Sequence, residues 1–149
     1  MVVLNKTILI LEDDLITVSK LLKRLADLEA DQPFSLSTIV LSNYQQVEEF
    51  INSREKLNVD IVLLDRDCKL GGSFHVYGME KFGADNIIAI SSVPEYNQDL
   101  IARGVKKAIL KDYRYLDKFA DEVVKEIEKR LKKHSLLDTL KKQYINIGN

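Results

Sequence analysis

The segment Asp60-Ile61-Val62-Leu63-Leu64-Asp65 decides the fold, because it places four large aliphatic residues between two carboxylates. A run this short without polar alternation is typical of a strand buried on both faces of a parallel sheet. Asp65 would then lie at the carboxyl end of the strand, where open α/β sheets bind their ligands. Taken alone, Asp65 is better explained as an ordinary turn residue.

Four further apolar runs have the same character. They are Thr7–Leu11, Thr38–Leu41, Asn86–Ile90 and Ala108–Leu110. Segments with apolar residues at helical spacing separate the runs, and a long segment of this kind follows the last one from Leu116 onward. The alternation predicts an α/β fold with a doubly wound, five-stranded parallel sheet and helices on both faces.

Local signals place the ends of several helices. Ser42, with Gln45 three residues later, has the spacing of a capping box at a helix start. Pro94 suits the first turn of another helix, and Gly104 suits its end. Ser73–Phe82 is predicted to be helical, although Gly78 interrupts its pattern.

Residues 1–133 are expected to form one domain and residues 134–149 a helical tail. Ser135 and Asp138 favour the cap of a further short helix, which carries Leu136, Leu137, Leu140 and Tyr144. These apolar residues are out of phase with the preceding stripe, so the tail is expected to fold back or to meet another subunit. Only 16 residues follow Lys133, too few for a DNA-binding output domain, so output by protein–protein contact or dimerisation is expected.

Composition indicates a soluble globular protein. The 149 residues are 46% hydrophobic and 30% charged, with no signal-peptide pattern and no apolar stretch of membrane-spanning length, so a cytoplasmic location is expected. The single Cys68 cannot form an internal disulfide.

The charge is unevenly distributed along the chain. Residues 1–102 hold 9 basic and 16 acidic side chains (−7), and residues 103–149 hold 13 basic and 7 acidic side chains (+6). Acids alternate with the bases in the basic part, which favours a solvated helix face over a nucleic-acid or membrane surface.

Four of the predicted strands end on reactive groups. These groups are Glu12 with Asp13, Asp65, Ser91 and Lys111. Clustered carboxylates repel one another unless a cation joins them, and Mg²⁺ prefers such oxygen ligands. A carboxylate can accept a phosphoryl group as an acyl phosphate, while a metal ion, an ammonium and a hydroxyl each hold one phosphoryl oxygen. The set is therefore sufficient for phosphoryl transfer to Asp65, although capping by Asp13 and Asp14 remains an alternative for the first pair.

Because these reactive residues follow the strands in this order, the chain resembles response-regulator receiver domains of the CheY-like superfamily. The resemblance extends from Thr7 to about Lys133. The resemblance implies that Asp65 is the phosphoacceptor for a histidine kinase or histidine phosphotransfer protein. It implies that Glu12, Asp13, Asp65 and the main-chain carbonyl of Asp67 hold Mg²⁺. It also implies a signalling protein that catalyses only its own phosphorylation and hydrolysis, acts on a downstream protein or as a homodimer, and binds neither nucleic acid nor membrane.

The chain departs from the family's pattern at four positions. Asp112 follows Lys111 where proline is usual, so the cis peptide found there is not expected. Lys69 replaces a common proline, and Asp67 adds an acid near the phosphoryl group. Ala108 stands where an aromatic residue is common, three positions before the lysine, and alanine has no rotamer to switch.

Two other functions remain open. Leu64-Asp65-Arg66-Asp67 resembles the motif of haloacid-dehalogenase-type phosphatases, in which Asp65 would be the nucleophile and Asp67 the general acid. That motif begins its fold and needs another strand with acidic ligands, whereas the 38 residues after Lys111 have a helical pattern. A degenerate receiver that acts only as an interaction module is disfavoured, because all the reacting residue types are present. His75 and His134 are interpreted as packed or solvated side chains.

Overall fold

The structure is a computed structural model that describes residues 4–31, 34–54, 58–66 and 79–147. Its centre is a five-stranded sheet in the order β2-β1-β3-β4-β5, and all the strand pairs are parallel. The strands are β1 (Leu4–Leu11), β2 (Phe34–Leu41), β3 (Ile61–Leu64), β4 (Ile87–Ala89) and β5 (Lys107–Ala108). The predicted five-stranded parallel sheet is confirmed, with β2 four residues longer at its start than the sequence pattern indicated.

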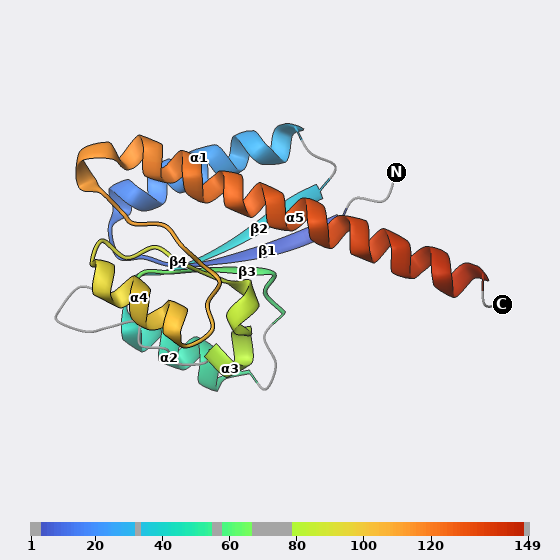
Figure 1. Cartoon of the computed structure of the whole chain (residues 1–149), viewed down its shortest axis with the longest axis horizontal. Helices are drawn as coiled ribbons and strands as arrows, with labels where there is room; N and C mark the ends of the chain where they lie inside the picture. Colours follow the sequence, from blue (N-terminus) through green and yellow to red (C-terminus); the bar gives the residue numbers. More distant parts are fainter. Residues whose placement is uncertain (1–3, 32–33, 55–57, 67–78, 148–149) are drawn as a thin grey trace.

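Helices cover both faces of the sheet (Figure 1). α1 and α5 lie on one face, and α2, α3 and α4 lie on the other. The helices are α1 (Leu15–Asp31), α2 (Tyr44–Asn52), α3 (Met79–Phe82), α4 (Pro94–Ala102) and α5 (Leu116–Ile147), with 3₁₀ turns η2 (Ala84–Asn86) and η3 (Tyr113–Tyr115). The doubly wound arrangement follows from right-handed crossovers between parallel strands.

β3 is buried on both faces, as its unbroken apolar run predicts. Ile61 and Leu63 pack in the core beneath α1 and α5, whereas Val62 and Leu64 pack in the core beneath α2 and α4. None of the four side chains is more than 3% exposed. Successive side chains of a strand point to opposite faces of the sheet, so this short segment contributes two residues to each of the two cores.

The register of the strands aligns their carboxyl ends. Leu11 pairs with Leu64, and Leu64 pairs with Ala89. The ladder continues past the strands, since the main-chain nitrogen of Asp65 donates to Leu11 O at 3.0 Å and that of Lys111 donates to Ser91 O at 3.1 Å. The residues that follow each strand consequently meet at one edge of the sheet.

Two of the local predictions need correction or fall partly outside the described residues. The N-cap of α2 is Asn43 and not Ser42, because the Asn43 side chain accepts from Gln46 N at 2.9 Å. The Gln46 side chain accepts from Ser42 N at 2.8 Å, so it reaches the residue before the cap and not the cap itself. Of the predicted helix Ser73–Phe82, only α3 lies within the described residues.

α4 begins at Pro94, as predicted, and Gly104 follows its end with a φ of +105°. This left-handed conformation is strained for residues with a side chain, which explains glycine there.

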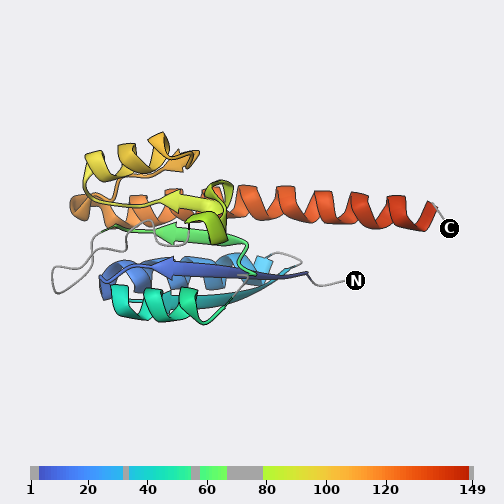
Figure 2. The same ribbon diagram turned by 90° about the horizontal axis from the view of Figure 1, so that it is seen from below.

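α5 is one continuous helix and not a helix followed by a folded-back tail. It runs from Leu116 to Ile147 and its last turns project beyond the sheet (Figure 1, Figure 2). The predicted cap at Ser135 is wrong, because neither glycine nor proline interrupts the chain there and serine is tolerated inside a helix. No helix in the described part of the chain is long and apolar enough to span a membrane.

Candidate functional site

The predicted reactive residues meet at the carboxyl edge of the sheet. Lys111 Nζ lies 2.5 Å from Asp65 Oδ2 and 2.8 Å from Glu12 Oε2. All three side chains are almost completely buried. The aligned ends of β1 and β3 and the segment after β5 therefore create a buried cluster of two carboxyl groups and one ammonium.

The protonation of this cluster differs from that of its separate groups. Burial, followed by the charge of Asp65, raises the pKa of Glu12 to about 8, although Lys111 opposes the shift. The pKa of Lys111 is raised despite its burial, because Asp65 and Glu12 stabilise the ammonium. Burial thus favours the protonated form of Glu12, whereas the two neighbouring acids favour the charged form of Lys111.

Glu12, Asp13 and Asp65 also form a group suited to a metal ion. Each offers a carboxylate oxygen, and these three oxygens lie within 4.8 Å of one another. Hard divalent cations take such oxygen donors, so the residues fit Mg²⁺ or Mn²⁺. Asp67, whose carbonyl was predicted as a further ligand, lies outside the described residues.

Asp14, and not Asp13, caps the amino end of α1. Asp14 Oδ2 accepts from Thr17 N at 3.2 Å and from Thr17 Oγ1 at 2.5 Å. Burial alone would raise the pKa of Asp14, but these hydrogen bonds from Thr17 overcome that effect and lower it. The capping explanation therefore applies to Asp14 and leaves Asp13 beside the other two acids.

Ser91 lies at the same edge, fully buried, directly after the β4 ladder. Its hydroxyl oxygen accepts from Val93 N at 3.1 Å. Its main chain is held by Asn97, whose side chain accepts from Ser91 N and donates to Ser91 O, both at 3.0 Å. The position of Ser91 is thus coupled to α4 by a pair of buried hydrogen bonds.

Sequence reasoning missed Asn97. The signal was present, since Asn97 is a polar residue three positions before Leu100 and shares its helix face. Both side chains are buried, and a buried amide needs partners. A buried amide within an apolar helix face could have been read as an anchor.

Arg66 makes a second connection from this edge to α4. Its Nη1 lies 2.9 Å from Asp99 Oδ2, and its guanidinium stands 4.8 Å from the centre of the Tyr96 ring. Asp99 also pairs with Arg103 at 3.1 Å. The residue after Asp65 is therefore tied to α4, which the sequence pattern did not indicate.

Ala108 is half-buried against the core beneath α2 and α4. The Lys111–Asp112 peptide is trans, as predicted. Asp112 instead caps η3, where its side chain accepts from Arg114 N at 3.0 Å.

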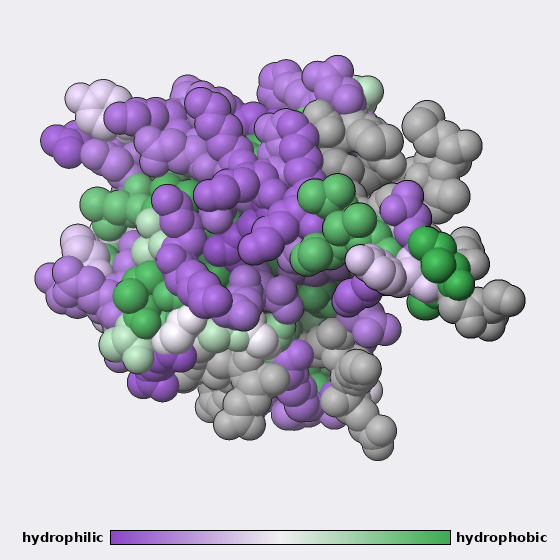
Figure 3. All heavy atoms as spheres, turned by 45° about the vertical axis from the view of Figure 1, so that its right-hand side comes forward, coloured by the Kyte–Doolittle hydropathy of each residue, from purple (hydrophilic) through white to green (hydrophobic). Residues whose placement is uncertain are grey.

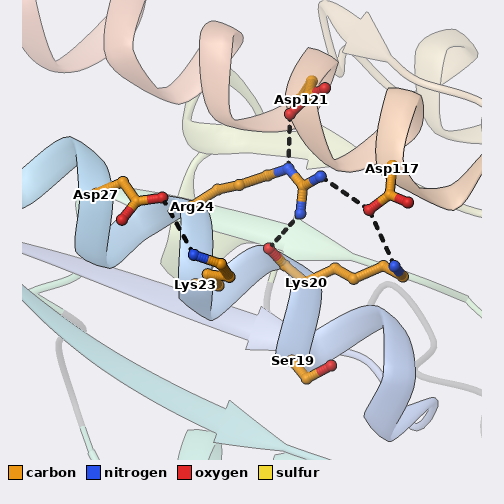
Figure 4. A pocket seen from close by; sticks show the side chains of 7 residues that line it. All are labelled: Ser19, Lys20, Lys23, Arg24, Asp27, Asp117 and Asp121. Atoms are coloured by element: carbon orange, nitrogen blue, oxygen red, sulfur yellow. Dashed lines mark hydrogen bonds and ion pairs between the residues drawn. The ribbon is translucent and has the colours of Figure 1, made fainter.

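A groove between α1 and α5 contains many charges but lies away from this edge (Figure 4). Arg24 reaches Asp121 at 2.6 Å and Asp117 at 2.9 Å, and Lys20 also contacts Asp117 at 2.9 Å. Because its cations and anions pair with one another, this groove is interpreted as a set of ion pairs that joins the two helices and not as a ligand site.

Comparison with known proteins supports the fold through structure alone. No family model matches the chain, and no curated protein matches it. Among solved structures, the phosphorylated cyanobacterial phytochrome response regulator RcpA is similar, with a TM-score of 0.59 and 17% identity over 84% of this chain and 92% of that one. A response regulator receiver domain from Rhodospirillum rubrum gives 0.59 and 16% over 78% and 87%. The Mn²⁺-bound form of response regulator Rcp1 gives 0.58 and 15% over 79% and 91%. The chain therefore has the fold of response-regulator receiver domains, as its sequence pattern predicted.

Proposed function

We propose that this chain is a cytoplasmic receiver domain of a two-component phosphorelay, in which Asp65 accepts a phosphoryl group from a histidine kinase or a histidine phosphotransfer protein. The observation that carries the proposal is the buried contact of Lys111 with Asp65, beside a carboxylate group suited to a divalent cation. Ion pairs that serve only stability are seldom built next to two further acids, because the extra acids repel the pair's own anion.

The chemistry is a displacement at phosphorus. An oxygen of the Asp65 carboxylate attacks the phosphorus of a phosphohistidine and forms an acyl phosphate. The N–P bond breaks, and its electron pair stays on the imidazole nitrogen, which takes a proton. Lys111 then neutralises one phosphoryl oxygen, and the Ser91 hydroxyl donates a hydrogen bond to another.

Glu12, Asp13 and Asp65 would hold Mg²⁺, together with the main-chain carbonyl of Asp67. When bound, the ion neutralises charge on the carboxylates and on the phosphoryl oxygens. Ionised Glu12 is the form that would bind a cation, so the burial that raises its pKa opposes binding.

Output would pass through protein–protein contact. α4 is the first candidate, because Asn97 joins it to Ser91 and Arg66 joins it to the residue after Asp65. A phosphoryl group that draws Ser91 toward itself would therefore move an exposed helix that a partner can contact.

Mass spectrometry after incubation with a small phosphodonor and Mg²⁺ tests the proposal. The wild-type chain should gain one phosphoryl mass, and neither Asp65→Asn nor wild type in EDTA should gain it. Sustained hydrolysis of a generic phosphomonoester would instead support the haloacid-dehalogenase-type phosphatase. A wild-type chain that is folded yet never labelled would support the degenerate receiver.

A further inference from the structure

The projecting part of α5 carries a row of exposed apolar side chains that nothing in the described part of the chain covers. Leu137, Leu140, Tyr144 and Ile147 follow one another at three- and four-residue steps and are 45%, 42%, 77% and 82% exposed. This spacing puts them on one face of the helix, as in a seam where two helices pack together. Figure 3 shows hydrophobic side chains gathered at this end of the molecule. Exposed apolar surface of this kind marks a binding site.

The row overlaps only one edge of the face by which α5 packs on the sheet, because Leu137 lies about five whole turns beyond the buried Phe119. That face ends at Leu131, which is fully buried. Leu137 follows six residues later and is rotated by roughly a third of a turn about the helix axis at 3.6 residues per turn. The centre of the apolar row therefore lies to one side of the core-packing face of α5.

Toward the sheet, the row leads into a basic groove. Glu126, Arg130 and Lys133 precede Leu137 at the same three- and four-residue steps. All four residues line a groove of about 570 Å³ between α5, η2 and the start of β5. One helix face thus runs from a polar groove into an apolar row.

The acids of this groove are already paired. Arg130 Nε contacts Glu126 Oε1 at 3.1 Å, and Lys106 Nζ contacts Asp85 Oδ1 at 3.0 Å. Three exposed lysines of the groove have no ion-pair partner in the described part of the chain. They are Lys107, Lys129 and Lys133. The groove therefore presents uncompensated positive charge to an incoming partner.

We propose that this surface, from Glu126 to Ile147 of α5 with its adjoining groove, docks an acidic amphipathic helix of a partner protein. The apolar side chains of that helix pack on the row, and its carboxylates pair with the groove lysines. A second copy of this chain fits poorly, because residues 103–149 hold 13 basic and 7 acidic side chains and two copies would set like charges opposite one another.

The surface lies at the amino edge of the strands, whereas Asp65 lies at the carboxyl edge. η2 precedes β4, and Lys106 directly precedes β5. A partner docked here leaves Asp65 open to a phosphodonor, so the surface is separate from the proposed phosphorylation site. It is also separate from the α4 surface proposed for output.

Binding of designed peptides to the full chain tests this proposal. The probe is a peptide of about three heptads with Leu at positions a and d and Glu at e and g, and the comparison peptide carries Lys at e and g. The acidic peptide should bind, more weakly as salt rises, and the basic peptide should not. Leu140→Glu, and separately the double variant Lys129→Glu with Lys133→Glu, should each weaken binding at least about tenfold. Lys118→Glu, on an exposed part of α5 outside the surface, should leave binding unchanged.

Several outcomes would overturn the proposal. Equal binding of the two peptides, or unchanged binding in Leu140→Glu with its helix content intact by circular dichroism, would show that the surface is not the site. Self-association of the wild-type chain in sedimentation, lost in Leu140→Glu, would assign the row to a second copy. Binding to vesicles of anionic phospholipid, also lost in Leu140→Glu, would assign it to a membrane.

Discussion

The two ends of β3 carry the same residue type in different surroundings. Asp60, at the amino end, accepts from Thr7 N at 2.8 Å and lies 3.8 Å from the ammonium of Lys6. Asp65, at the carboxyl end, contacts Lys111 and lies close to two further acids. At the first end one carboxylate joins two strands, and at the second end acids are gathered beyond what one lysine can neutralise.

The difference separates a carboxylate that joins two strands from one that we propose to be functional. The partners of Asp60 satisfy it, since a main-chain donor and a cation serve one acid whose side chain is 31% exposed. At the other end, burial raises the pKa of Glu12, so holding it near Asp65 costs stability. Such a cost is retained when a ligand uses the site.

Substitution of the two aspartates should give the largest contrast. Asp65→Asn should abolish phosphoryl labelling, because the amide is not a nucleophile toward phosphorus. Asp60→Asn should be labelled like the wild type but lose about 1 kcal/mol of unfolding free energy, since it weakens a hydrogen bond to a partly exposed charge. Mass spectrometry and urea unfolding measure the two effects. Loss of labelling in a folded Asp60→Asn would remove the contrast between the two ends.

Two neighbouring aspartates allow the same contrast to be made within one loop. Asp13→Asn should lower Mg²⁺ affinity at least about tenfold and raise the melting temperature in EDTA, because it removes one of three adjacent carboxylates. Asp14→Ala should leave the Mg²⁺ affinity unchanged and should lower the free energy of unfolding by about 1 kcal/mol, because it removes the cap of α1. Titration calorimetry and thermal melts measure these changes. A lower melting temperature in Asp13→Asn would mean that Asp13 also serves as a cap.

The pH dependence of stability should differ between the metal-free and the metal-bound protein. The pKa of Glu12 rises from 4.5 to about 8 on folding, so the folded chain holds a proton that the unfolded chain releases. This contribution to stability is complete below pH 4.5 and is lost as the pH rises through about 8. The raised pKa of Lys111 gives no loss in this range, because its contribution persists below its ordinary value of 10.5.

The melting temperature in EDTA should therefore fall from about pH 4.5 to about pH 8 and level off above it, and it should fall less in Glu12→Gln, a control that cannot ionise. With Mg²⁺, affinity should rise over the same range, because the metal binds the ionised carboxylate. Parallel pH profiles of wild type and Glu12→Gln in EDTA would contradict the assignment of this titration to Glu12.

Much of the fold followed from the sequence because its strands are short, unbroken and apolar. β3 is the clearest case, since four consecutive buried residues leave no alternative to a strand covered on both faces. The edge residues Glu12, Asp65, Ser91 and Lys111 could be placed together because parallel strands bring their carboxyl ends to one side.

The remaining features depended on tertiary contacts that have no local signature. Arg66 meets Asp99 across 33 positions of sequence, and only the folded chain shows their contact. The observed cap of α2 lies one residue after the predicted one. Asn43 and Ser42 are both good caps, and only the position at which the helix begins distinguishes them. The α5 extension was misjudged because a change of apolar phase was interpreted as a break, whereas it marks a change of face on one helix.

The smallest expected effect concerns how the site communicates with α4. Ser91 Oγ accepts from Val93 N at 3.1 Å, so turning the hydroxyl toward a phosphoryl oxygen should release the main chain at Val93. Asn97 holds both main-chain polar groups of Ser91, so a displacement of Ser91 should reach α4. Ala108 has no side-chain rotamer to exchange. Directly after β5, Ile109 N donates to Ala89 O at 2.8 Å and holds this segment against β4.

Phosphorylation should therefore alter residues 92–103 while Ala108–Leu110 stays nearly unchanged. Amide hydrogen exchange, with and without a phosphoryl analogue and Mg²⁺, measures this. Asn97→Ala should still be labelled at Asp65 but should show a smaller change across α4, because the link to Ser91 is gone. Gln98→Ala is the matched control, since Gln98 is the next residue of α4 and its side chain is exposed. The hypothesis is wrong if the largest change in protection falls on Ala108–Leu110 and residues 92–103 show none.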